Sequence, residues 1–119
     1  MSSHRLKTYS GESGYVYQYY FLESQPRKRW WSRFGTAFLF HVTSDRKQFF
    51  TVEVLVEDRA LEAWERSHGR ALLEPEQYAA AKMRLFRAFD ESENPGSIAG
   101  VRVSESNIES LLEPLHLDD

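Results

Sequence analysis

The segment "PRKRWWSRF", residues 26–34, combines positive charge with aromatic rings in a way that suits an anionic partner. Its cations and indoles are Arg27, Lys28, Arg29, Arg33, Trp30 and Trp31. Cations neutralise phosphates and aromatic rings stack on bases, so this composition is typical of single-stranded nucleic-acid sites. It equally suits an anionic membrane surface, where indoles lie at the depth of the headgroups. A third interpretation is a solvated loop whose tryptophans fold back over the core.

A second candidate site comes from the tyrosine-rich stretch "GYVYQYYFL". In a strand, alternate tyrosines of this stretch share one face. His41 lies in a neighbouring apolar run and could act there as a general acid or base, with Glu53 as the nearest expected carboxylate. More often such a histidine is half-buried and satisfied by a carbonyl or a hydroxyl. The candidate pocket for a small ligand or an enzyme reaction consists of Tyr15, Tyr17, Tyr19, His41 and Glu53.

Other catalytic and metal-binding patterns are absent or incomplete. Glu62, Glu65 and His68 form E-x-x-E-x-x-H, but carboxylate-bridged di-iron bundles need a second Glu-x-x-His pair, which the sequence lacks. The chain has no cysteine, which excludes disulfides and thiolate ligands. It has no hydrolase elbow, phosphate-binding loop or dinucleotide fingerprint either. We therefore predict no catalytic residue, no metal site and no cofactor, and we expect a role other than that of an enzyme.

The composition is that of an ordinary globular domain with an uneven charge distribution. The 119 residues are 41% hydrophobic and 28% charged, with a net charge of −3, which favours one domain over residues 1–119. Residues 1–12 are a candidate for disorder. Residues 1–52 hold eight Lys/Arg and three acids, whereas residues 53–119 hold seven and fifteen. Such asymmetry suits an anionic partner for the basic half, or attraction between two halves or two copies.

The sequence shows no signal for export or for membrane insertion. Its longest apolar runs are much shorter than the roughly 20 residues that a membrane-spanning helix needs. The start of the chain has no apolar h-region of a secretory signal. We therefore expect no transmembrane segment and a cytoplasmic location.

Three runs with a period of two predict strands over residues 15–22, 36–42 and 49–56. The polar, basic residues between the first two runs are expected to connect these strands. Turn formers between the second and third runs indicate a hairpin, and short connections favour an antiparallel meander. The short "VRV" run at 101–103 is a candidate edge strand.

The period then changes to 3.6, which predicts helices after the strands. Asp58 is the expected N-cap of a first helix, and Gly69 is its expected stop. A second helix opens at "EPEQ", residues 74–77, where proline suits the first turn. Ser106 and Glu109 have the spacing of a capping box for a third, short helix.

Strands grouped before helices predict an α+β fold. We expect an antiparallel sheet of three to four strands, formed by the N-terminal meander, with two to three helices packed on one face. The first strand is bulky on both sides, so its uncovered face must meet solvent, a second subunit or a ligand. The leading functional prediction is a small binding domain without catalytic activity that forms a homodimer through its aromatic sheet face. The alternatives are the site at 26–34 and the pocket around His41.

Overall fold

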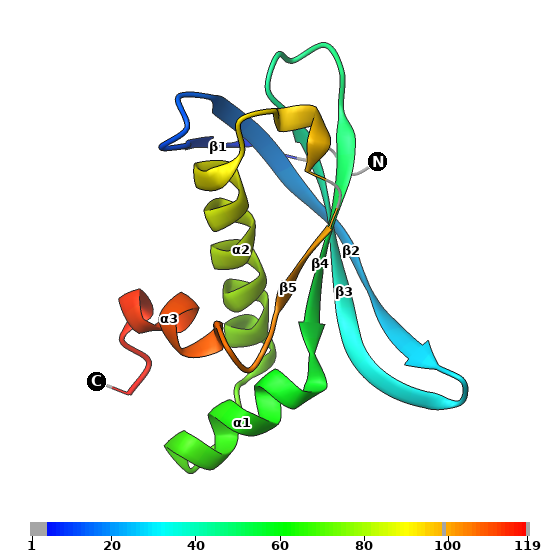
Figure 1. Cartoon of the computed structure of the whole chain (residues 1–119), viewed down its shortest axis with the longest axis vertical. Helices are drawn as coiled ribbons and strands as arrows, with labels where there is room; N and C mark the ends of the chain where they lie inside the picture. Colours follow the sequence, from blue (N-terminus) through cyan, green and yellow to red (C-terminus); the bar gives the residue numbers. More distant parts are fainter. Residues whose placement is uncertain (1–4, 99, 119) are drawn as a thin grey trace.

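The computed structural model describes residues 5–98 and 100–118 and shows an α+β fold (Figure 1). Within these residues, one sheet contains five strands in the order β1-β2-β3-β4-β5. The strands are β1 (Lys7–Ser10), β2 (Val16–Arg29), β3 (Ser32–Thr43), β4 (Phe50–Glu57) and β5 (Gly100–Val103). The helices are α1 (Asp58–His68), α2 (Glu74–Glu91) and α3 (Ile108–Leu112), with short 3-10 turns η1 (Pro95–Ser97) and η2 (Glu113–Leu115).

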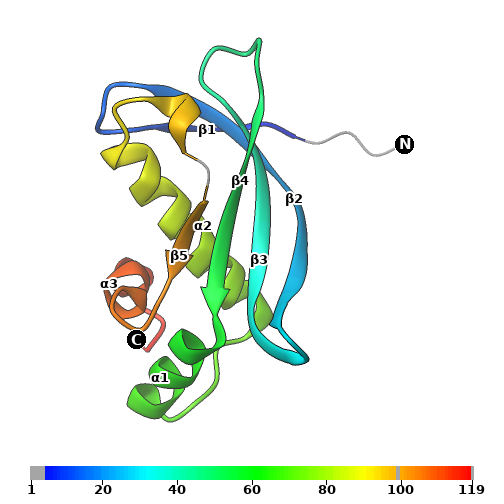
Figure 2. The ribbon, with the colours of Figure 1, turned by 45° about the vertical axis from the view of Figure 1, so that its right-hand side comes forward.

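The sheet is mixed rather than purely antiparallel, and it is strongly curled (Figure 2). Strands β1 to β4 are antiparallel neighbours, as expected for a meander. Strand β5 instead pairs in parallel with β4, because α1 and α2 carry the chain back along the sheet between these two strands. The expected antiparallel sheet of three to four strands is therefore corrected to a five-stranded sheet with one parallel edge pair.

Strand β1 lies in the segment that the sequence left as a candidate for disorder. It pairs with β2 in antiparallel register. The Tyr9 ring stacks on Phe86 of α2 with a centroid distance of 4.3 Å, and the Tyr9 hydroxyl donates to Asp90 at 2.9 Å. Burial and this hydrogen bond raise the pKa of Tyr9 to about 12. Residues 7–12 therefore contact β2 and α2, whereas residues 1–4 lie outside the described residues.

The core lies between one face of the sheet and the helices, with α2 packed across the strands (Figure 2). Tyr17 and Tyr19 of β2 point into this core and are 0% and 3% exposed. The Tyr17 ring stacks on Phe89 of α2 with a centroid distance of 4.0 Å. Burial of large apolar side chains of this kind stabilises the fold by roughly 1.5–3 kcal/mol each. The tyrosine cluster thus supplies packing, and the shared face expected for Tyr17 and Tyr19 is the core face.

The helix boundaries follow local signals with small shifts. Helix α1 begins at Asp58 itself with Glu57 as the N-cap, so Asp58 places a negative charge in the first turn rather than capping it. Gly69 ends α1 as expected, in the left-handed conformation with a φ of 74°. Helix α3 begins after Asn107, so the capping box expected from Ser106 is not formed. No helix in the described part of the chain is long and apolar enough to cross a bilayer.

Candidate functional site

The basic and aromatic segment forms the far end of the β2–β3 hairpin rather than a loop between two strands. Pairing continues to Arg29 opposite Ser32, which leaves a two-residue turn made of Trp30 and Trp31. The residue of β3 nearest the turn that still pairs with β4 is Gly35. Beyond it, the hairpin continues past β4 as a two-stranded ribbon (Figure 1). The expected polar connection is therefore corrected to a strand extension.

The two tryptophans of the turn are exposed to solvent. Trp30 and Trp31 are 85% and 86% exposed, with ring centroids 6.1 Å apart and an interplanar angle of 59°. The interpretation in which the indoles fold back over the core is therefore excluded. Trp30 has a φ of 63°, a left-handed conformation that costs bulky residues roughly 1–2 kcal/mol. Two-residue hairpin turns prefer Gly, Asn or Asp at such positions.

Only part of the positive charge in this segment is unpaired. Arg27 donates to Glu53 at 2.6 Å, and the Nε atom of Arg33 lies 3.7 Å from a carboxylate oxygen of Asp58. Lys28 and Arg29 form no ion pair with any residue that the structure describes, and they directly precede the two tryptophans in the sequence. We define the hairpin tip as these cations and the two indoles: Lys28, Arg29, Trp30 and Trp31.

The structure divides the second candidate set between the two faces of the sheet. Tyr17 and Tyr19 lie in the core, where burial raises the pKa of both hydroxyls. Tyr15 is 41% exposed at the start of the strand region. His41 and Glu53 belong to the opposite, outer face, because side chains alternate along each strand and the register is fixed. The five residues therefore do not line one cavity.

His41 lacks the partners that acid–base catalysis would need. Its ring lies between the rings of Tyr20 and Phe49, at centroid distances of 5.2 and 5.0 Å. Its Nδ1 atom is buried and has no hydrogen-bond partner among the described residues. Glu53, the carboxylate expected beside it, accepts from Arg27 instead. His41 therefore packs as a half-buried ring on the outer face of the sheet.

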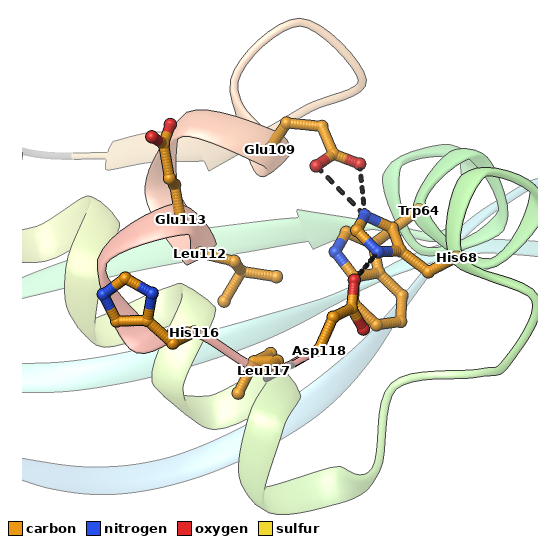
Figure 3. A pocket seen from close by; sticks show the side chains of 8 residues that line it. All are labelled: Trp64, His68, Glu109, Leu112, Glu113, His116, Leu117 and Asp118. Carbon is orange, nitrogen blue, oxygen red and sulfur yellow. Dashed lines mark hydrogen bonds and ion pairs between the residues drawn. The ribbon is translucent and has the colours of Figure 1, made fainter.

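A pocket of about 320 Å³ lies where the C-terminal segment meets α1 (Figure 3). His68 stacks on Trp64 with a centroid distance of 4.0 Å and lies between two carboxylates. Its Nε2 atom lies 2.8 Å from Glu109, and its Nδ1 atom contacts Asp118. Burial by itself lowers the pKa of His68, but the hydrogen bonds to the two carboxylates raise it, and the net shift is upward. Because a carboxylate contacts each ring nitrogen, neither nitrogen is free to bind a metal or to take up a substrate proton.

The His68 cluster holds the C-terminal segment against α1 and was not visible in the sequence. Its two carboxylate partners lie 41 and 50 residues away from His68, so no local spacing could reveal it. Glu62 and Glu65, the glutamates of the E-x-x-E-x-x-H pattern, are exposed. Within residues 5–98 and 100–118, no group of three or more His, Asp or Glu side chains is arranged to hold a metal ion.

No protein-family model, curated protein or solved structure shows a significant match to this chain. Its function must therefore be inferred from the geometry and charge of its own surfaces.

Proposed function

We propose that the chain is a non-catalytic binding domain that contacts an anionic partner through the hairpin tip. The observation that carries the proposal is the exposure of Trp30 and Trp31, at 85% and 86%. Two neighbouring indoles in this position add almost nothing to the core, and one of them occupies a backbone conformation that disfavours it. Tryptophan is also a residue type enriched in the centres of binding interfaces. A ligand contact is a better explanation for these side chains than folding is.

The charge of the hairpin tip supports an anionic partner. Lys28 and Arg29 carry two positive charges without an ion-pair partner in the described residues, although the whole chain has a net charge of −3. Cations that stand next to exposed rings provide electrostatic attraction together with an apolar contact. The hairpin tip therefore combines both elements in four consecutive residues.

The surroundings of His68 and His41 favour a binding role over a catalytic one. His68 uses both ring nitrogens in hydrogen bonds to carboxylates, and His41 has no carboxylate beside it. A general acid or base must have one ring nitrogen within hydrogen-bond reach of the substrate proton. Both nitrogens of His68 are already occupied, and Glu53, the carboxylate expected beside His41, is bonded to Arg27 instead, so we assign no catalytic residue.

Tryptophan fluorescence tests the proposal because the buried and the exposed indoles report differently. Trp64 is 1% exposed, so a ligand at the hairpin tip changes chiefly the emission of Trp30 and Trp31. Two anionic ligands are titrated into the full chain at low and at physiological salt: a mixed-sequence single-stranded oligonucleotide and vesicles that contain phosphatidylserine. We expect at least one of them to bind, with an affinity that falls as salt rises.

A charge-reversal variant locates the contact. Lys28→Glu with Arg29→Glu should abolish binding, whereas the matched control Lys47→Glu with Arg66→Glu should bind like the wild type. The control makes the same change in net charge at two exposed cations, one in the β3–β4 loop and one at the end of α1. Arg27 is left intact because its substitution would unpair Glu53. Equal loss in both variants would contradict the proposal.

A second candidate is self-association through the outer face of the sheet, since no described helix covers this face (Figure 2). The sequence predicts dimerisation through whichever face of the first strand stays uncovered, and because Tyr17 and Tyr19 lie in the core, a homodimer would use the opposite, outer face. The side chains of this face include Tyr20, Leu39 and His41, together with Phe49, whose ring stacks on His41. Sedimentation should then show a dimer at high micromolar concentration that Leu39→Glu converts to a monomer. A wild-type monomer at that concentration would rule the candidate out.

A further inference from the structure

The hairpin tip lies beyond the part of the β2–β3 hairpin that pairs with β4. Between Gly35, the last β3 residue paired with β4, and the turn lie three residues, which correspond to roughly 10 Å at about 3.3 Å per residue. This length exceeds the Debye length of about 8 Å at physiological ionic strength. A surface in contact with the turn therefore senses the two unpaired cations more strongly than distant acids of the chain, and the Asp58 carboxylate that reaches this ribbon is paired with Arg33.

The order of side chains at the hairpin tip matches the layers of a bilayer surface. The indoles of Trp30 and Trp31 occupy the extreme end, and amphipathic rings of this type favour the headgroup region, where the N–H group stays hydrated. Lys28 and Arg29 precede them on β2 and alternate between its two faces. Their stems can therefore reach lipid phosphates on both sides of the ribbon while the rings insert.

Single-stranded nucleic acid fits the hairpin tip less well. Such sites follow the backbone over about 4–16 nucleotides along a cationic groove lined with stacking rings. Along this hairpin the next cations are Arg27 and Arg33, which are already paired with Glu53 and Asp58. The two indoles are tilted by 59°, so they do not form a parallel pair that could hold a base. The hairpin tip therefore offers a small contact surface and lacks the extended cationic groove that a single strand would follow.

We infer that the hairpin tip binds the surface of an anionic phospholipid bilayer, with both indoles at headgroup depth and both cations against lipid phosphates. The inference rests on the proposed function and adds the class of partner to it. Binding through two rings and two cations is peripheral, reversible and sensitive to salt, because no other part of the described hairpin contributes free positive charge.

Cosedimentation of the full chain with vesicles tests this inference. Phosphatidylcholine vesicles with about 30% phosphatidylserine are compared with phosphatidylcholine alone, since each basic residue near an anionic surface contributes measurably to binding. We expect the wild type to bind the anionic vesicles, and Lys28→Glu with Arg29→Glu to weaken binding at least about tenfold. Trp30→Ala with Trp31→Ala should weaken it similarly, and circular dichroism should show that both variants fold.

Two controls distinguish a failure of this inference from a failure of the proposed function. The control Lys47→Glu with Arg66→Glu should bind vesicles like the wild type. In a parallel arm, the same proteins are titrated with the mixed-sequence oligonucleotide. If the oligonucleotide binds through the hairpin tip and vesicles do not bind, the inference fails and the proposed function stands. If neither ligand binds, or if hairpin-tip and control variants bind alike, both fail.

Discussion

Replacement of Trp30 by glycine should separate binding from stability. Trp30 is 85% exposed and has a φ of 63°. Glycine adopts this conformation freely, which removes a cost of roughly 1–2 kcal/mol. If the indole stabilised the fold, its removal would lower the free energy of unfolding. If it serves binding, its removal should leave the fold intact and should weaken the interaction with anionic vesicles.

The expected change in the free energy of unfolding is small because opposing terms nearly cancel. About 15% of the Trp30 surface is covered, or roughly 30 Å² of a ring that can bury about 200 Å², and this area is worth about 0.7 kcal/mol. The extra conformational freedom of glycine in the unfolded chain costs a further 0.5–1 kcal/mol, roughly. Relief of the left-handed strain offsets both terms. We therefore expect the unfolding free energy of Trp30→Gly to stay within about 1 kcal/mol of the wild type.

Urea unfolding followed by far-ultraviolet circular dichroism measures this difference without relying on tryptophan emission. Phe89→Ala is the matched comparison, since Phe89 is fully buried and stacks on Tyr17. It should lose about 3–5 kcal/mol. A loss above about 2 kcal/mol for Trp30→Gly would refute the reasoning, because it would mean that the indole packs against the fold.

Three further outcomes follow from contacts elsewhere in the protein. Against the lowering effect of burial, the carboxylates raise the pKa of His68 in the folded protein above 6.5, its value in the unfolded chain. The stability that protonated His68 contributes is therefore fully present below pH 6.5 and is lost as the pH rises through the folded-state pKa. His68→Gln should flatten the fall in the urea midpoint above pH 6.5. Hydrogen bonds from Arg70 lower the pKa of Glu76 to about 2, from 4.5 in the unfolded chain. The stability that ionised Glu76 contributes is therefore present above pH 4.5 and is lost as the pH falls toward 2. Glu76→Gln should remove that loss in acid unfolding measurements. Gly35→Ala places a Cβ atom 2.8 Å from the Val56 carbonyl oxygen and should destabilise the fold in urea by about 1–3 kcal/mol.

Much of the fold could be predicted because the relevant signals are local. The alternation of Tyr17 and Tyr19 predicts that they share a face, and Gly69 predicts the end of α1. Strand β1 escaped prediction because it is short and polar. It is held in place by a hydrogen bond from Tyr9 to Asp90, a residue 81 positions away. Contacts of this range leave no periodic trace in the sequence.

The residues of the candidate site were predictable from their types, but their chemical state was not. Composition marks the four cations of the segment as equal, and only the folded sheet shows that the Arg27 side chain reaches Glu53 on β4. Likewise, the start of α1 brings Asp58 to Arg33. The exposure of the two indoles depends on which residues occupy the turn, and this is set by the pairing of β2 with β3. The two ion pairs depend on contacts between residues far apart in the sequence, which single-sequence patterns do not report.

The depth of the indoles in a bilayer can be measured by quenching of tryptophan emission with brominated phospholipids. The full chain is mixed with anionic vesicles whose acyl chains carry bromine either near the headgroup or near the chain end. We predict strong quenching by the shallow bromines, weak quenching by the deep ones, and none for Trp30→Phe with Trp31→Phe, whose remaining Trp64 is buried. Emission that neither lipid quenches, or quenching that persists in the double variant, would contradict binding through the hairpin tip.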